Sequence, residues 1–200
     1  MIPLEDAQSH VMKNIKTLKD ENVHLLQGRN RAITEPILSN ESIPPFDNTA
    51  VDGYAVKAID TKGATQETPI SLTVLETIAA GKPPTFAIQS GECSKIMTGA
   101  PIPDGADAVV MVERTEQQEN GSVVAIEEEV SKGQHIRRSG EDLEPGDLVI
   151  PQGTILNAAH LGLLASLGIY QITTVRIPTV GVFSTGDELL EGSQELKPGQ

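Results

Sequence analysis

Three pairs of acidic residues stand at or beside glycine-containing turns. They are Asp47 with Asp52 in "IPPFDNTAVDGYAV", Glu141 with Asp142 in "IRRSGEDLEPGDLV", and Asp187 with Glu188 in "VGVFSTGDEL". Carboxylates carried on turns can converge to hold Mg²⁺, which prefers oxygen ligands, or can act as general acids and bases where proximity shifts their pKa values. Each pair taken alone is more typical of a solvated turn than of a site, because Asp, Asn and Gly are common turn residues.

A threonine turn and a basic segment add further polar groups. The stretch "KIMTGAP" places Thr98 and Gly99 after an apolar strand, where backbone N–H groups can approach an oxyanion, although a plain strand end fits the same residues. The segment "HIRR" at 135–138 is densely basic and directly precedes Glu141 and Asp142. It either balances these acids or receives a phosphate group.

The composition is that of a globular chain with one or two domains. Of the 200 residues, 38% are hydrophobic and 22% are charged. No apolar stretch approaches the length of about 20 residues that a membrane span needs. The first residues, up to Asp20, are polar and lack the apolar core of a signal peptide. We therefore expect a cytoplasmic protein that does not bind membranes.

Charge and aromatic content argue against nucleic-acid binding. The net charge is -13 with a pI near 4.6, and two Tyr, three Phe and no Trp leave little for stacking on bases. Cys93 is the single cysteine, which excludes an internal disulfide. The four histidines show no HxH or HExxH spacing. Transition-metal chemistry through His and Cys is therefore not expected.

Periodicity predicts the elements that must position these groups. Apolar residues at intervals of three and four over 4–19 predict an amphipathic helix that begins after Pro3 and packs on another surface. A second helix is predicted from the N-cap Asn157 to Gly168. Short apolar or alternating runs predict strands at 54–58, 70–78, 106–113, 123–126, 148–150, 169–177 and 179–183.

Two turns and one strand carry more specific signals. Asn120-Gly121 predicts a hairpin that joins 110–112 to 123–126, and Pro145-Gly146 occupies the centre of a predicted type II turn. The continuously apolar run at 179–183 is typical of a parallel strand covered on both faces. Because such a strand needs a neighbour and a crossover, we expect it to open an α/β domain whose remainder lies outside this sequence.

Four segments in matching order resemble one enzyme family. The segments "PPFDNTAVDGYAV", "IMTGAPIPDGADAVVMVE", "IRRSGEDLEPGDLV" and "VGVFSTGDEL" resemble the molybdopterin molybdenumtransferases, known as MoeA, which include the gephyrin E domain. The resemblance covers nearly all of this chain and the N-terminal half of a family member. It implies an α+β fold with a mixed α/β extended lobe, an inserted β-rich lobe and the first strand of a truncated α/β molybdopterin-binding domain. The implied boundaries are 1–45 with 138–176, 46–137, and 177–200.

The resemblance also implies an activity and its site. The activity is the insertion of molybdate into adenylated molybdopterin with release of AMP, assisted by Mg²⁺. The implied catalytic residues are Asp52, Thr98, Asp142 and Glu188, of which the three acids are also the implied metal ligands. Cofactor-binding residues are implied at Arg137, Ser184, Thr185, Gly186 and Asp187. The implied partners are a second copy of the chain, in a homodimer with the site between subunits, and the adenylating enzyme of the same pathway.

This chemistry sets two requirements. The oxo groups of molybdate leave as water, so neighbouring acids with raised pKa values are expected to deliver protons. Molybdate and the nucleotide are anions, whereas the chain has a net charge of -13. A local positive field must therefore come from basic residues, and the candidates are Lys82, Lys95, Arg137 and Arg138.

Two alternatives stay open on the sequence. The first is a noncatalytic dimerisation or scaffold module of the gephyrin type. The second is a carboxylate-lined Mg²⁺ phosphohydrolase unrelated to molybdenum, which activity on a generic phosphoester without pterin would favour.

Overall fold

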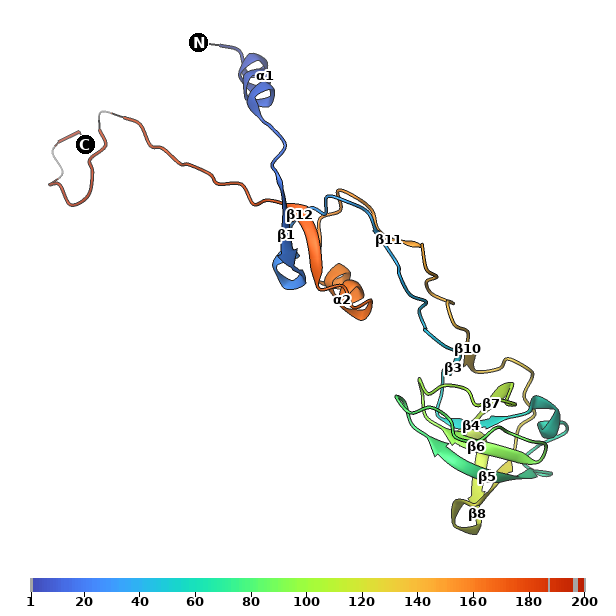
Figure 1. The fold of residues 1–200 in the computed structure, drawn as a ribbon. Coiled ribbons are helices and arrows are strands. Elements are labelled where there is room, and N and C mark those ends of the chain that lie inside the picture. The colour runs from blue at the N-terminus through green and yellow to red at the C-terminus, as the bar shows by residue number, and fades with distance from the viewer. Residues whose placement is uncertain (1, 187, 196–197, 200) are drawn as a thin grey trace. The chain divides into compact units, whose positions relative to one another are not determined.

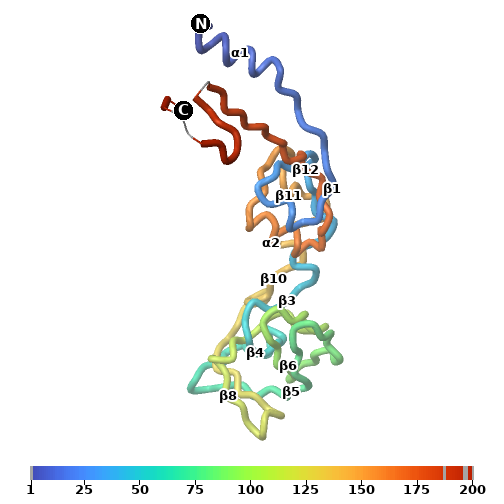
Figure 2. The backbone as a smooth tube through the Cα atoms, turned by 90° about the vertical axis from the view of Figure 1, so that its left-hand side faces the viewer, coloured from blue at the N-terminus to red at the C-terminus, as the bar shows by residue number. Residues whose placement is uncertain are grey.

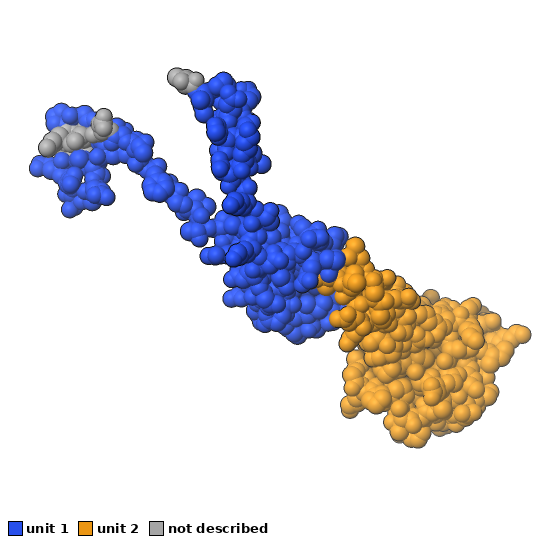
Figure 3. Space-filling model, turned by 45° about the horizontal axis from the view of Figure 1, so that its top comes forward, with its two compact units in different colours: residues 1–36, 150–200 blue, residues 37–149 orange. Residues whose placement is uncertain are grey.

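The structure is a computed structural model that describes residues 2–186, 188–195 and 198–199. The chain divides into two compact units (Figure 3). The first unit comprises residues 1–36 and 150–200, and the second unit comprises residues 37–149. The domain boundaries implied by the family resemblance stay a prediction.

A curled six-stranded sheet makes up most of the second unit (Figure 1). The strand order is β7-β4-β6-β5-β9-β8, and neighbouring strands are antiparallel except β5 and β6. The strands are β4 Gly53–Val56, β5 Ile70–Ile78, β6 Glu92–Ile96, β7 Ala108–Met111, β8 Thr115–Gln118 and β9 Val123–Ile126.

Strand β4, which directly follows Asp52, is buried on both faces. Its successive side chains enter two apolar clusters, because residues of a strand point alternately to opposite faces. Tyr54 and Val56 belong to one cluster and Ala55 to the other. Strand β4 also pairs with β6 on one edge and β7 on the other. The backbone after Asp52 is therefore fixed from four sides.

Short elements complete the second unit. Strands β3 and β10 lie side by side and pair antiparallel (Figures 1 and 2), and β2 pairs with β11. These strands are β2 Ile37–Leu38, β3 Asn48–Thr49, β10 Ile136–Arg137 and β11 Leu148–Ile150. The 3-10 helices are η2 Ala58–Thr61, η3 Val112–Arg114 and η4 Glu119–Gly121.

The first unit is built on one antiparallel pair, β1 with β12. Its elements are α1 Leu4–Asn14, β1 Asp20–His24, η1 Leu25–Gly28, α2 Ala158–Ser166 and β12 Gln171–Val175. Gly28 packs so closely on this core that a Cβ there would lie 2.3 Å from Ile172 Cδ1. Within the described ranges, no helix is long and apolar enough to cross a membrane.

Several predicted elements are confirmed. Strand β5 spans the predicted 70–78, and helix α2 begins after Asn157 as predicted. Gly146 and Gly168 have φ of 97° and 70°, as the type II turn and the helix C-terminus require.

The N-terminus of α2 carries a reciprocal cap. Asn157 Oδ1 accepts the His160 backbone N–H at 3.0 Å, and His160 Nδ1 accepts the Asn157 N–H at 3.2 Å. Asn157→Ala is expected to lower the free energy of unfolding by about 1 kcal/mol, because the His160 backbone N–H loses its acceptor. Urea unfolding followed by far-UV ellipticity measures this, with Asn157→Asp as a control that keeps an acceptor oxygen. Equal stability of the two variants would contradict the role of the cap.

The first helix is shorter than predicted. Helix α1 ends at Asn14, and Ile15 is extended, although the apolar periodicity continues to residue 19. No described residue of α1 is buried, so the expected packing of its apolar stripe is not seen within this chain. Without a tertiary surface, helix length depends on local propensity alone, which supports only short helices.

The hairpin prediction is correct in its turn and wrong in its first strand. Asn120 and Gly121 have φ of 56° and 90°, but the strand that this turn joins to β9 is β8, at 115–118 rather than 110–112. The predicted partner residues belong mostly to β7, which pairs with β4. Strand β8 is polar, with the sequence TEQQ, and therefore gives no apolar signal.

The strand predicted at 179–183 does not form. This segment has no regular secondary structure, and Val182 and Phe183 are 87% and 89% exposed. A parallel strand needs a neighbour to satisfy its backbone groups, and no strand of the described residues pairs with this one. The expected α+β class with a first α/β strand is therefore corrected to a mostly β fold with two α-helices.

Candidate functional site

Asp52 and Thr98 are in direct contact. Asp52 Oδ1 accepts both the backbone N–H and the hydroxyl of Thr98, each at 2.7 Å. Both residues are exposed at the sheet end where β4 begins and β6 ends. Two residues that the sequence singled out from segments 46 positions apart therefore form one cluster.

The backbone around this contact is tied down by further hydrogen bonds. Gly99 N–H donates to Thr49 O at 2.9 Å, and Thr49 N–H donates to Ala100 O at 3.1 Å. Gly99 has φ of 80°, which favours glycine at this turn. On the other side, Val112 N–H donates to Asp52 O at 3.0 Å. The carboxylate is thus presented to solvent from a fixed position.

Asp52 is held in its ionised form. Its pKa is lowered by the Thr98 backbone hydrogen bond, by the Thr98 hydroxyl and by the charge of Lys95. Lys95 lies on β6 opposite Tyr54. An anionic oxygen suits a cation or a hydrogen-bond donor, so the expectation of a raised pKa for proton delivery is wrong for Asp52.

A second cluster of charges lies where β3 and β10 pair. Asp47 accepts the Ser139 backbone N–H at 2.8 Å and forms an ion pair with Arg138. Arg137 Nη2 lies 2.6 Å from Asp142 Oδ2, and Arg137 Nε lies 3.7 Å from Glu141 Oε1. The sequence left two roles for the basic segment 135–138, balancing nearby acids or receiving a phosphate group. The structure shows Arg137 and Arg138 paired with acids. The cofactor-binding role of Arg137 stays a prediction.

The contacts of Asp47 with Ser139 and Arg138 predict how stability depends on pH. The pKa of Asp47 is lowered from 3.8 by the Ser139 hydrogen bond and then by Arg138. Its stabilisation is therefore complete above the unfolded-state pKa and is lost as pH falls through the lower folded-state pKa. Arg138→Ala is expected to raise the Asp47 pKa toward 3.8. NMR titration of the Asp47 carboxyl carbon measures this pKa, and an unchanged value would contradict the ion pair. Because both groups are partly exposed, the energy involved is below about 1 kcal/mol.

The C-terminal candidates belong to the first unit. Ser184, Thr185 and Gly186 are exposed and have no regular structure. Glu188 is exposed, and its carboxylate folds back so far that a Cβ on Gly186 would lie 2.2 Å from Glu188 Oε1. Asp187 lies outside the described residues. The cofactor-binding role of these residues stays a prediction.

The implied metal ligands of the second unit, Asp52 and Asp142, have different partners. Among the described residues, no group of three or more His, Cys, Asp and Glu side chains is arranged to hold a metal ion. Asp52 is bound to Thr98, whereas Asp142 is paired with Arg137. The role of Asp52, Asp142 and Glu188 as metal ligands stays a prediction.

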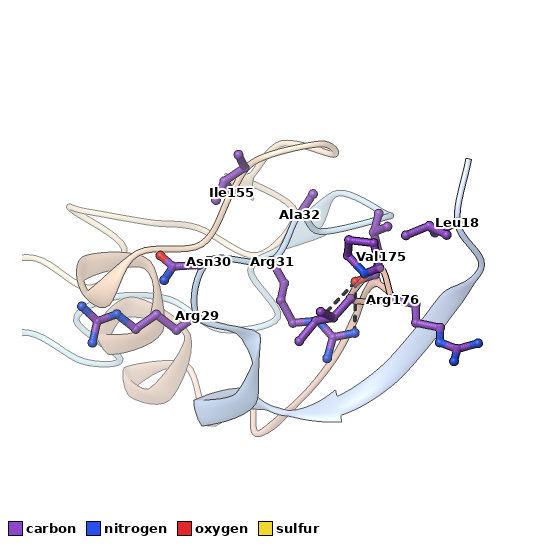
Figure 4. A pocket seen from close by; sticks show the side chains of 10 residues that line it. Leu18, Arg29, Asn30, Arg31, Ala32, Ile155, Val175 and Arg176 are labelled. Carbon is purple, nitrogen blue, oxygen red and sulfur yellow. Dashed lines mark hydrogen bonds between the residues drawn. The ribbon is translucent and has the colours of Figure 1, made fainter. Parts of the chain in front are cut away.

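The first unit holds a cavity of about 480 Å³, shown in Figure 4. Arg31 is buried beside it, donates to Val175 O at 3.0 and 3.2 Å, and pairs with Glu21. Arg29 and Arg176 lie at opposite ends of the cavity (Figure 4). Because these arginines do not converge and Arg31 is already neutralised, the cavity does not form a focused anion site.

Comparisons with known proteins decide the family. The profile described as "MoeA N-terminal region (domain I and II)" matches residues 2–168. The chain belongs to the MoeA family. It is 40% identical over its whole length to molybdopterin molybdenumtransferase 2 of Mycobacterium tuberculosis, covering 49% of that protein, and 37% identical to the Bacillus subtilis molybdopterin molybdenumtransferase, covering 47%. The crystal structure of the Pyrococcus horikoshii MoeA protein superimposes with a TM-score of 0.85 at 36% identity over 98% of this chain and 51% of that one.

This MoeA chain spans about half the length of the curated relatives it matches. The sequence named Lys95 as a source of positive charge, and the register of β4 and β6 brings that charge to bear on Asp52. It did not indicate Glu76, which accepts the backbone N–H groups of Thr85 and Phe86. Neither contact has a signature in local spacing, because one depends on strand pairing and the other on how the loop after β5 folds back.

Proposed function

We propose that the chain acts in molybdenum cofactor biosynthesis as the N-terminal part of a molybdopterin molybdenumtransferase. The proposed reaction inserts molybdate into adenylated molybdopterin and releases AMP. The observation that supports it most directly is the exposed contact between Asp52 and Thr98, within the region matched by the MoeA profile. A rigid turn that presents an ionised carboxylate and a hydroxyl suits recognition of an oxyanion substrate with its cation.

The charge state of each site residue determines its proposed role. Asp52, with its lowered pKa, accepts hydrogen bonds or holds a cation and does not donate the protons that convert oxo groups to water. Proton delivery falls to Asp142, Glu188 or solvent. The exposed Thr98 hydroxyl donates a hydrogen bond to Asp52, so the lone pairs of its oxygen remain free to accept one.

Asp52 fits Mg²⁺ as one carboxylate ligand. Both hydrogen bonds from Thr98 fall on Oδ1, which leaves Oδ2 for a cation. Mg²⁺ keeps several waters and commonly uses one or two carboxylates together with substrate phosphates, so a full cage of protein ligands is not required. When bound, the ion would neutralise charge developing on the departing AMP.

The test is AMP release from adenylated molybdopterin with molybdate and Mg²⁺. The chain is assayed alone and together with a polypeptide that supplies the remaining half of a MoeA relative. Release only in the mixture would support a site completed by both parts. No release from a complex shown to form would favour the noncatalytic scaffold function instead. Hydrolysis of a generic phosphoester without pterin would favour the phosphohydrolase.

A homodimer is part of this proposal. It is supported by the apolar side chains of α1, since Val11 and Met12 are 59% and 68% exposed. Val11→Glu is expected to shift a dimer toward monomer in analytical ultracentrifugation, because a buried charge would be unpaired. Lys13→Glu on the same helix is the matched control. A monomeric parent chain would contradict the proposal.

A further inference from the structure

A hollow of about 460 Å³ in the second unit lies beside the candidate site. We call it the Phe46 hollow, and its lining residues are Phe46, Gly81, Lys82, Pro83, Pro84 and Pro101. Its walls are mainly apolar, because they contain the aromatic ring of Phe46 and three prolines, and Lys82 is the one charged lining residue. Its volume falls in the range of small-molecule sites, which typically combine apolar walls with few polar groups.

The hollow shares its backbone with the Asp52–Thr98 contact. Pro101 ends the turn that begins at Thr98, and it forms a bridge with Asn48. Phe46 directly precedes the clamped Asp47, whose carbonyl accepts the Ile102 N–H at 3.0 Å. The paired segments 46–52 and 98–101 therefore each contribute to both the hollow and the carboxylate site.

The loop that forms the other wall is preorganised. Glu76 Oε1 accepts the N–H groups of Thr85 and Phe86 at 2.8 and 3.0 Å. Lys82 N–H donates to Ala79 O at 3.1 Å, and Gly81 has φ of 80°. The following pair of prolines fixes two further φ angles. A ligand would thus enter a formed site rather than order a flexible loop.

Charge distinguishes Lys82 from the other cations. The ion pairs in the described part of the chain engage Arg137 and Arg138 but not Lys82 or Lys95. Lys95 already acts on Asp52. Of the four candidate cations Lys82, Lys95, Arg137 and Arg138, Lys82 is therefore the one that lines the hollow and can meet a new anion there.

We propose that the Phe46 hollow binds a flat aromatic heterocycle that carries a phosphate, with the ring against Phe46 and the prolines and the phosphate at Lys82. The inference rests on the proposed function, whose substrate joins two such heterocycles, adenine and pterin, through phosphates. It assigns one end of that substrate to the second unit, next to Asp52.

The test titrates the 200-residue chain with AMP, adenosine and neopterin monophosphate. Amide NMR shifts locate the site and calorimetry gives Kd. Phe46→Leu keeps apolar bulk without a ring and is expected to weaken phosphate-bearing ligands about tenfold, as expected for a lost stacking contact. Lys82→Ala is expected to weaken them several-fold in low salt and to leave adenosine unaffected. Phe46→Tyr keeps the ring and should bind like the parent chain.

Matched controls are Phe86→Leu and Lys62→Ala. Phe86 is 52% exposed against 43% for Phe46, and it lines a neighbouring hollow instead. Both controls should stay within about twofold of the parent Kd. Shifts with AMP alone or neopterin monophosphate alone would identify which ring enters. No binding of either, or equal losses in Phe46→Leu and Phe86→Leu, would overturn the inference.

Failure of the hollow and failure of the proposed function have different signatures. In the complemented AMP-release assay, an unchanged KM for Phe46→Leu would contradict substrate binding in the Phe46 hollow, although the proposed activity would still be supported. Conversely, the complex could release no AMP while the chain still bound the ligand only when residue 46 carried an aromatic ring. That result would contradict the proposed activity and would support the Phe46 hollow as a nucleotide or pterin site.

Discussion

Gly53→Ala is expected to unfold the second unit under conditions where the parent chain is folded. A Cβ on Gly53 would lie 2.0 Å from Val110 O and 2.9 Å from Val110 C, both backbone atoms of the paired strand β7. Side-chain rotation cannot relieve this clash, so β4 and β7 must separate. We expect a loss of about 3 kcal/mol or more, at the upper end of overpacking effects. Thermal unfolding, with amide exchange in β4 and β7, measures it.

The control is Gly162→Ala in helix α2. Nothing lies within 4 Å of a Cβ at Gly162, and its backbone is helical. This substitution is expected to leave stability unchanged or to raise it by about 0.5–1 kcal/mol, because alanine restricts the unfolded chain more than glycine does. If Gly53→Ala unfolded within 1 kcal/mol of the parent chain, the close approach of β4 and β7 would be wrong.

Local chemistry made much of the fold predictable. The N-cap Asn157, the turn glycine Gly146 and the run at 70–78 each carry their signal within a few residues, and the structure confirms all three. What the sequence could not provide was strand pairing. The polar β8 has no apolar pattern, so its pairing with β9 depends on adjacency and on β7 being occupied by β4.

The candidate site was also predictable only in part from the sequence. Motif resemblance brought Asp52 and Thr98 into one predicted site, and in the structure the two side chains are hydrogen-bonded. Asp47 was paired with Asp52 by sequence proximity, yet it binds Arg138, 91 positions away. Two carboxylates in one short segment therefore have separate tasks. Asp47 holds β10 and its loop, and Asp52 faces solvent.

Asp52→Asn is expected to lower AMP release about a hundredfold in the complemented enzyme, the scale seen when one preorganised group at a reacting centre is removed. The amide oxygen of Asn can still accept both hydrogen bonds that Asp52 Oδ1 receives from Thr98. The substitution thus removes the charge and preserves the turn. The loss should be partly offset by raised Mg²⁺ if Asp52 is a metal ligand, and unaffected by Mg²⁺ if it orients substrate only.

Asp47→Asn is the matched control, because it removes a carboxylate of the same segment that binds Arg138 and Ser139. Its expected effect is on stability at neutral pH, with AMP release by the folded fraction retained. Thr98→Val adds a second arm, since loss of the hydroxyl donor is expected to raise the Asp52 pKa and shift the acidic limb of the rate profile to higher pH. Equal losses of activity in Asp52→Asn and Asp47→Asn would show that both act through folding, and the chemical role of Asp52 would be wrong.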